Sequence, residues 1–170
     1  SHLKALRAID SGWFKDEITK VKVTTRQLGE GGAAKITDSW FDTDEGPRKD
    51  TSIAGLAKLK PAFLQGGSVT AGTSSQMSDG AAMCLVVSGD FVKKHNLKPI
   101  ARFLSFAVAG VPPRIMGIGP IQAIPLAAKK AGIKVQDIHR FELNEAFASQ
   151  ALAVIRTCGI DPTKVNPTGG

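Results

Sequence analysis

The stretch Phe141–Gln150, which reads FELNEAFASQ, places an amide and a carboxylate at the junction between a predicted strand and a predicted helix. Ile138–Leu143 has the composition of a short strand. Ala146–Thr157 predicts a helix, because its apolar residues recur at roughly helical spacing. Functional groups of α/β enzymes gather where strands end and helices begin. The sequence therefore makes Asn144 a candidate site residue.

The side chain of Asn144 is neutral at every accessible pH and offers both an N–H donor and a C=O acceptor. Such a group suits holding a water molecule or a substrate carbonyl oxygen as negative charge develops. The alternative is that Asn144 only caps the helix, since Asn ranks among the best N-cap residues.

Two further stretches precede this one along the chain. They read VTAGTSSQMSDGAA at residues 69–82 and RIMGIGP at residues 114–120. Together with NEAFA at residues 144–148, and in this order, they resemble the signatures of the thiolase family. The resemblance covers residues 1–170. Within the family, DEGPR at 44–48 and LKPAF at 59–63 are most similar to the degradative type, the 3-ketoacyl-CoA thiolases and acetyl-CoA acetyltransferases.

The resemblance implies an α/β fold, part of a layered architecture with two similar βαβ-type domains and an inserted loop domain. Residues 1–80 would be the C-terminal part of the loop domain. Residues 81–98 would be the last strand and helix of the N-terminal domain, and residues 99–170 the first part of the C-terminal domain. Family members also carry a nucleophilic Cys, a Gly-His-Pro motif and a second reactive Cys, and none of these is in the chain. We therefore expect an internal fragment that is inactive alone.

The implied activity is that of a CoA-dependent acyltransferase. It cleaves 3-ketoacyl-CoA with CoA to acetyl-CoA and a shortened acyl-CoA, or runs the reverse Claisen condensation. The alternative is a non-catalytic CoA-binding or interaction module. The resemblance implies CoA thioesters as substrates, no separate cofactor, and a homo-oligomer, either dimer or tetramer, for the full-length protein. The compartment would be cytoplasmic in a bacterium and mitochondrial or peroxisomal in a eukaryote.

The resemblance gives Asn144 the role of orienting an oxyanion-hole water. It assigns contacts with the CoA substrate to six other residues: Arg48, Phe63, Ala71, Ser75, Met116 and Phe147. Apart from Ala71, each of these residues has a structural alternative. The three large apolar residues are of the kind that fills cores, Arg48 suits any surface, and Ser74 and Ser75 could simply satisfy their own loop. Thr73 departs from the family, which usually has Asn there, and this leaves the hydrogen bonding of the loop open.

Composition narrows the class of protein. A hydrophobic content of 42% with 22% charged residues is ordinary for a globular chain and argues against extensive disorder. The net charge of +7 favours anionic partners. The basic residues are scattered along the chain, however, which argues against nucleic acid as the partner. No apolar run is long enough for a membrane span. Cys84 and Cys158 have no metal-ligand spacing, and we expect Cys84 to be buried in a strand and inert.

The rest of the chain predicts strands alternating with helices. Gln27–Asp50, rich in glycine and charge, predicts a surface loop. Ala81–Val87 is a continuous apolar run of the kind found in strands buried on both faces. Further helices are predicted at Ser1–Phe14, ending near Gly12, and at Ile53–Lys60, Asp90–His95 and Gly119–Gly132, and further strands at Ile18–Val23 and Ile100–Val111.

Overall fold

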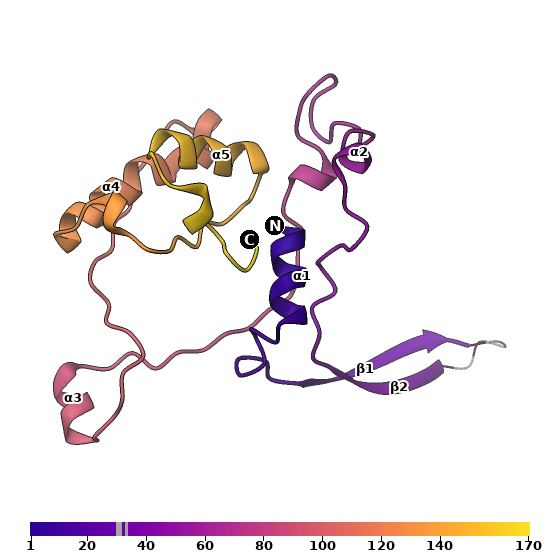
Figure 1. The fold of residues 1–170 in the computed structure, drawn as a ribbon. Coiled ribbons are helices and arrows are strands. Elements are labelled where there is room, and N and C mark those ends of the chain that lie inside the picture. The colour runs from indigo at the N-terminus through magenta and orange to yellow at the C-terminus, as the bar shows by residue number, and fades with distance from the viewer. Residues whose placement is uncertain (30–31, 33) are drawn as a thin grey trace.

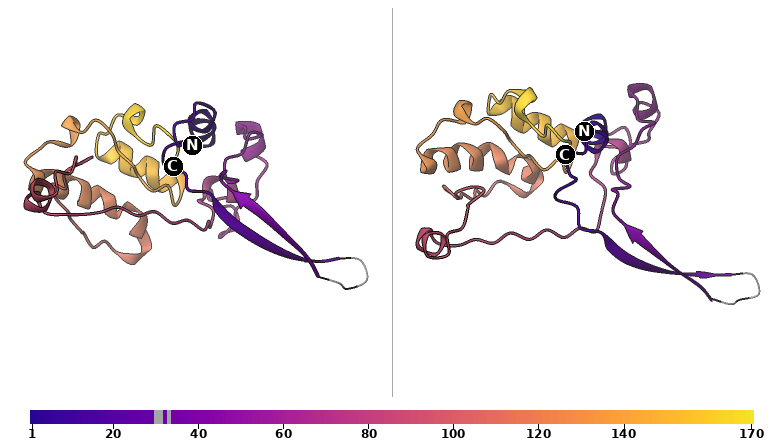
Figure 2. Two further views of the ribbon diagram at one scale, coloured as in Figure 1. Left: turned by 90° about the horizontal axis from the view of Figure 1, so that it is seen from below. Right: turned by 60° about the horizontal axis from the view of Figure 1, so that its bottom comes forward.

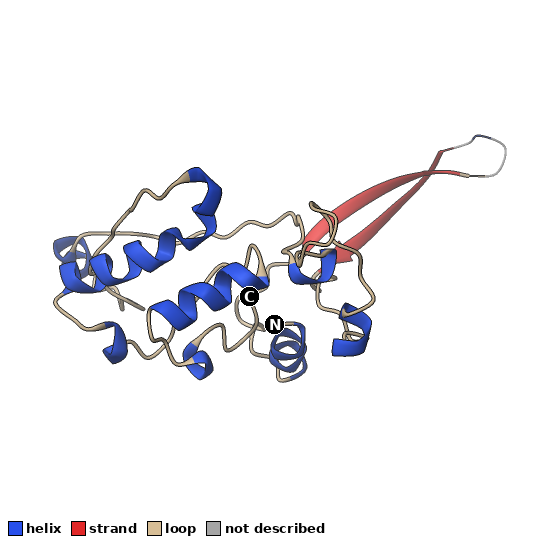
Figure 3. Ribbon diagram, turned by 90° about the horizontal axis from the view of Figure 1, so that it is seen from above, coloured by secondary structure: helices blue, strands red, loops and turns tan. Residues whose placement is uncertain are grey.

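The computed structural model describes residues 1–29, 32 and 34–170. Its secondary structure is mostly helical, with one pair of strands (Figures 1 and 3). The α-helices are α1 (His2–Asp10), α2 (Ile53–Leu56), α3 (Gly89–Lys94), α4 (Gly119–Ala131) and α5 (Ala148–Thr157). The strands are β1 (Val21–Leu28) and β2 (Ala34–Phe41), and short 3-10 helices are η2 (Ala71–Thr73), η3 (Pro113–Ile118), η4 (Val135–Asp137) and η5 (Pro162–Lys164).

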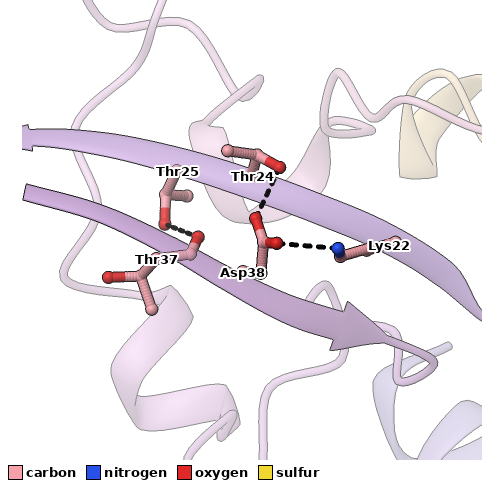
Figure 4. A network of polar contacts seen from close by, with 5 residues as sticks. All are labelled: Lys22, Thr24, Thr25, Thr37 and Asp38. Atoms are coloured by element: carbon pink, nitrogen blue, oxygen red, sulfur yellow. Dashed lines mark hydrogen bonds and ion pairs between the residues drawn. The ribbon is translucent and has the colours of Figure 1, made fainter.

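Strands β1 and β2 form an antiparallel hairpin that projects away from the helices (Figures 1 and 2). The ammonium of Lys22 lies 2.7 Å from a carboxylate oxygen of Asp38, and the Thr24 hydroxyl donates a 2.7 Å hydrogen bond to the same carboxylate (Figure 4). These two contacts lower the pKa of the Asp38 carboxyl. Lys20 and Asp42 form a second ion pair at 2.8 Å.

The hairpin corrects the prediction of a loop over Gln27–Asp50. Residues 34–41 form β2, and residues 30, 31 and 33 lie outside the described part of the chain. The glycines before β2 favoured a loop prediction, although β2 itself is rich in residues that favour strands, namely Ile36, Thr37, Trp40 and Phe41. Cross-strand pairing with β1 then decides the conformation, and pairing is a contact between residues that the local pattern does not show.

Helices α4 and α5 pack together and carry much of the small buried core (Figure 1). Ala128 of α4 and Ala151 and Val154 of α5 are buried. Pro125 lies inside α4 and has no N–H to donate to the carbonyl of Ile121. The thiol of Cys158, at the end of α5, lies 3.9 Å from that carbonyl oxygen and donates to it.

The predictions of helices at 1–14, 90–95, 119–132 and 146–157 are confirmed within a few residues at each end. Gly132 ends α4 in the left-handed conformation, at a φ of 73°, as a C-cap glycine does. The helix predicted at 53–60 is shorter, since α2 ends at Leu56. The strand predicted at 18–23 begins later and continues to Leu28.

Two predicted strands, 100–111 and the strand at 81–87 that was expected to be buried on both faces, are wrong as secondary structure. Both segments are irregular, and Leu85 and Phe103 are 80% and 77% exposed. The strand predicted at 138–143 is reduced to one parallel bridge between Phe141 and Val165. A strand needs a neighbour for its backbone N–H and C=O groups, and the residues that the structure describes supply none to these runs.

The segment 102–106 nevertheless lies against α4. The Ser105 hydroxyl donates a 2.8 Å hydrogen bond to the Ala127 carbonyl, and the Lys130 ammonium donates one of 3.1 Å to the Phe106 carbonyl. An open groove of about 510 Å³ separates residues 102–105 from residues 138–142. Across the described residues, no helix combines the length and the apolar character that crossing a bilayer requires.

Candidate active site

Asn144 lies between the bridge at Phe141 and the first turn of α5, and its side chain is exposed. Helix α5 begins after Phe147, which is the N-cap residue, and no side chain caps it. Within the described part of the chain, the Asn144 amide makes no hydrogen bond to protein. The capping alternative is therefore wrong, and the amide is free to bind a water or a ligand.

The loop that contains Ser74 and Ser75 packs directly beside this segment. The Ser75 N–H donates a 2.9 Å hydrogen bond to the Ala146 carbonyl, and Ser74 forms an antiparallel bridge with Phe147. The ring of Phe63 meets the ring of Phe147 edge to face, with centroids 6.1 Å apart and planes at 85°. Four predicted site residues, Phe63, Ser75, Asn144 and Phe147, are thus brought to one place.

Ser74 and Ser75 have different surroundings. The Ser74 hydroxyl donates a 2.8 Å hydrogen bond to the Thr70 carbonyl, so it satisfies the loop itself. Ser75 is exposed, and its hydroxyl has no protein partner among residues 1–29, 32 and 34–170. Of the two serines, Ser75 is the one whose hydroxyl is available to a ligand.

Thr73 supplies hydrogen bonds within the loop, at the position where the resemblance leads us to expect Asn. Its hydroxyl oxygen accepts a 2.9 Å hydrogen bond from the Thr70 N–H, and Thr70 is a buried residue. The same hydroxyl donates to the Thr70 carbonyl at 3.3 Å. Gly72 lets this turn approach α2 and the residues after it, because a Cβ at that position would clash with a methyl carbon of Leu56 in α2 and lie 2.6 Å from one of Leu59.

The other three predicted substrate-binding residues are outside this group of four: Ala71, Met116 and Arg48. Ala71 is exposed at the start of η2, on the same loop as Ser75. Met116 is 78% exposed on η3, the 3-10 helix that packs against α5, so the core alternative for Met116 is wrong. Arg48 is also exposed, and its backbone N–H donates a 3.2 Å hydrogen bond to the imidazole of His2. Among the described residues, no hydrogen bond or ion pair joins the Arg48 side chain to the residues around Asn144.

The comparisons with known proteins agree over the whole chain. The family model described as "Thiolase, N-terminal domain" matches residues 1–90, and that described as "Thiolase, C-terminal domain" matches residues 97–170. This chain belongs to the thiolase family. A 3-ketoacyl-CoA thiolase of Bacillus subtilis is 51% identical over 170 residues, which are 100% of this chain and 44% of that protein. The peroxisomal 3-ketoacyl-CoA thiolase B of Rattus norvegicus is 53% identical over 171 residues, 39% of its length.

Solved thiolase structures share the fold. The crystal structure of the Bacillus anthracis acetyl-CoA acetyltransferase matches with a TM-score of 0.92 at 42% identity, over 100% of this chain and 41% of that one. The dimeric peroxisomal thiolase of Saccharomyces cerevisiae matches with a TM-score of 0.88 at 42% identity, over 99% of this chain and 40% of that one. The α/β class and the part-of-a-thiolase-fold prediction are confirmed, and this thiolase chain spans less than half the length of these relatives.

The two cysteines of this thiolase chain differ in environment. Cys84 is exposed on the irregular segment 81–87, so the prediction that it is buried in a strand is wrong. Cys158 is half-buried, and burial raises the pKa of its thiol. Over the described residues there is no group of His, Cys, Asp and Glu that could hold a metal ion.

Asn166 belongs to the site although its sequence context does not single it out. Its side chain is 1% exposed and forms hydrogen bonds to Leu143 and Glu145, the two residues that flank Asn144. Burial of an Asn requires partners for its donors and acceptor, but its place in the sequence does not name them. Only the Pro that follows and the two glycines at 169–170 mark this stretch as a turn.

Proposed function

We propose that this chain supplies one wall of the active site of a CoA-dependent acyltransferase. The reaction is cleavage of a 3-ketoacyl-CoA by CoA to acetyl-CoA and a shortened acyl-CoA, or its reverse. The observation that carries the proposal is the free, exposed amide of Asn144 beside the loop that presents the Ser75 hydroxyl. The names of the relatives, which are 3-ketoacyl-CoA thiolases and acetyl-CoA acetyltransferases, support the same reaction.

In the cleavage direction, a Cys thiolate from another part of the enzyme adds to the 3-keto carbon. The bond between C2 and C3 then breaks, its electron pair stays on C2, and the thioester oxygen of the departing acetyl-CoA gains negative charge as an enolate. A proton on C2 completes acetyl-CoA, and the thiol of a second CoA takes the acyl group from the Cys. Asn144 orients a water that donates a hydrogen bond to the thioester oxygen while that charge develops.

Ser75, Phe63 and Phe147 bind the substrate in this proposal. The Ser75 hydroxyl is available to an amide of the pantetheine arm, whereas its backbone N–H is already bonded to Ala146. The edge-to-face pair of Phe63 and Phe147 offers an apolar surface to the arm or the acyl chain. Met116 extends the apolar lining, and Arg48 interacts with the nucleotide end of CoA. Ala71 lies beside the arm on the Ser75 loop.

We assign residues 1–80 to the loop domain, 81–98 to the N-terminal domain and 99–170 to the C-terminal domain. The N-terminal family model ends at residue 90 and the C-terminal one begins at residue 97, which supports a boundary near residues 98–99. The exposed apolar runs 81–87 and 100–111 would pair with strands from the rest of a longer enzyme, and relatives of greater length support this. That enzyme would be a homo-oligomer without a separate cofactor. Its compartment would be the cytoplasm in a bacterium, and the mitochondrion or the peroxisome in a eukaryote.

The test is an assay of a full-length enzyme that contains this chain. Incubation with a 3-ketoacyl-CoA and CoA should yield acetyl-CoA and the shortened acyl-CoA, and mass spectrometry detects both products. The 170-residue chain, assayed in parallel, should yield neither product. A full-length enzyme that binds CoA and forms no acetyl-CoA would overturn the proposal and support the non-catalytic module.

A further inference from the structure

The side chain of Asn166 replaces a rung of a parallel β-ladder. Phe141 donates its N–H to the Lys164 carbonyl at 2.9 Å and accepts from the Asn166 N–H at 2.8 Å, which is the parallel bridge between Phe141 and Val165. In a continued ladder, the next rung would join Leu143 to the main chain after Asn166. Asn166 has a φ of 45°, and its carbonyl accepts from the Gly169 N–H at 3.0 Å, so the main chain turns away.

The amide group of Asn166 occupies the place that the main chain leaves. Its Oδ1 accepts a 2.7 Å hydrogen bond from the Leu143 N–H, and its Nδ2 donates one of 2.7 Å to the Leu143 carbonyl. The second proton of Nδ2 goes to the Glu145 carboxylate at 2.8 Å. Leu143 and Glu145 are therefore both held by one buried side chain, and Asn144 lies between them.

The enclosure around this amide is tight. The Ser1 hydroxyl also donates to the Glu145 carboxylate. A Cβ on Gly170 would lie 2.8 Å from the carboxyl carbon of Glu145 and closer still to the Asn166 amide nitrogen, so a larger residue there would displace one of these two side chains. Asn166 is 1% exposed, which leaves water little access to these bonds. The arrangement admits one orientation of the amide, because a flipped amide would point its oxygen at a carbonyl and a carboxylate.

We infer that Asn166 is a positioning residue that fixes the backbone on both sides of Asn144 and so aims its amide at the reacting oxygen. This inference rests on the function proposed above. Asn144 has no protein partner of its own in the described structure, so its direction depends on the backbone that carries it. A small displacement of a group that must interact with a developing charge lowers the reaction rate strongly.

The test uses a full-length enzyme that contains this chain, with Asn166→Gly and Asn166→Asp. Glycine accepts the positive φ and removes the amide, while Asp keeps its shape and the acceptor for Leu143 but faces Glu145 with a like charge. Both variants should lower kcat by about a hundredfold. KM should stay within about threefold of the parent value, because the pantetheine contacts are untouched.

Thr163→Ala is the matched control. It removes a 2.7 Å hydrogen bond to Asp161, the N-cap residue of the preceding 3-10 helix η5, and the Thr163 side chain makes no hydrogen bond to residues 141–145 in the described structure. Its kcat should equal that of the parent. An Asn166→Gly variant with parental kcat, or one whose loss lies entirely in KM, would overturn the inference. A parent enzyme without thiolase activity would overturn the proposed function instead.

Hydrogen exchange tests the hydrogen bonds between the Asn166 side chain and Leu143 even in an enzyme that is inactive. The Leu143 N–H of the parent protein should be protected, because its acceptor is a buried side chain. In Asn166→Gly, and not in Thr163→Ala, that amide should exchange at least about tenfold faster. Exchange of the Leu143 amide in the parent at the rate of an unstructured peptide would overturn the inference.

Discussion

The backbone N–H of Ser75 donates a 2.9 Å hydrogen bond to the carbonyl of Ala146. This bond joins a small-residue loop to the segment that carries Asn144, although the two lie far apart in the sequence. The bond uses only main-chain groups, so it leaves the Ser75 hydroxyl and the Asn144 side-chain amide unoccupied. Both residues are exposed, and their two segments lie side by side. The substitutions below separate what each side chain does from what the backbone does.

Asn144→Ala in a full-length enzyme should lower turnover by about a hundredfold with little effect on substrate binding. The water that the amide orients acts on charge that appears mainly in the transition state. Thermal stability should not change, because Asn144 does not cap α5. Asn144→Ser, a good capping residue, should not restore activity. Steady-state kinetics with melting curves would decide, and an Asn144→Ser enzyme as active as the parent would contradict the catalytic role.

Ser75→Ala should weaken the binding of CoA substrates by about 1 kcal/mol, the worth of one neutral hydrogen bond. Turnover should hold, because the hydroxyl contacts the pantetheine arm away from the reacting carbon. Ser74→Ala is the matched control. It removes the hydroxyl that bonds the Thr70 carbonyl, so it should lower stability and leave affinity alone. A collapse of kcat with unchanged KM in Ser75→Ala would refute the binding role.

Thr73→Val should destabilise the Ser75 loop by about 1–3 kcal/mol, because the N–H of buried Thr70 loses its acceptor. Thr73→Ser keeps a hydroxyl at the same place and should cost much less. Chemical denaturation of the full-length enzyme measures both. Equal stability of Thr73→Val and the parent would show that the hydroxyl does not brace the loop.

Neither Cys84 nor Cys158 should become acylated when the isolated chain meets an acyl-CoA, because neither lies beside a base that could activate it. Iodoacetamide should label Cys84 faster than Cys158. Cys84 is exposed, whereas Cys158 is half-buried with a raised pKa. Intact-mass spectrometry follows both reactions. Stoichiometric acylation of either thiol would contradict the assignment of the nucleophile to another part of the enzyme.

The hairpin should lose stability in acid. Hydrogen bonds from Lys22 and Thr24 hold the pKa of Asp38 below its ordinary value of 3.8, and Lys20 does the same for Asp42. A carboxyl with a depressed folded pKa contributes fully above 3.8 and loses its contribution as the pH falls through the folded pKa. An NMR titration of the Asp38 carboxyl should show a midpoint below 3.8, and Lys22→Gln should raise it. An unshifted midpoint in the parent would contradict the ion pair.

The site was partly predictable. The motifs around Ser75 and Asn144 were identified from the sequence, and the structure brings their segments together with Phe63 and Phe147. The sequence could not tell whether Asn144 caps α5, nor which of Ser74 and Ser75 has a free hydroxyl. Those answers depend on which backbone group each side chain reaches, and the spacing of residues does not specify that.

The sequence by itself determined the family and the helices α1, α3, α4 and α5, because a helix forms its hydrogen bonds between residues four apart and shows its buried face at a local period. The tertiary structure alone decided β2, the loss of the predicted strand at 81–87, and the hydrogen bonds of the Asn166 side chain. Apolar runs such as 81–87 become strands only beside a partner, and β2 emerged through pairing with β1. Asn166 reaches Leu143 and Glu145 across more than twenty positions. Contacts of that separation are fixed by the path of the whole chain, so no local pattern of residues contains them.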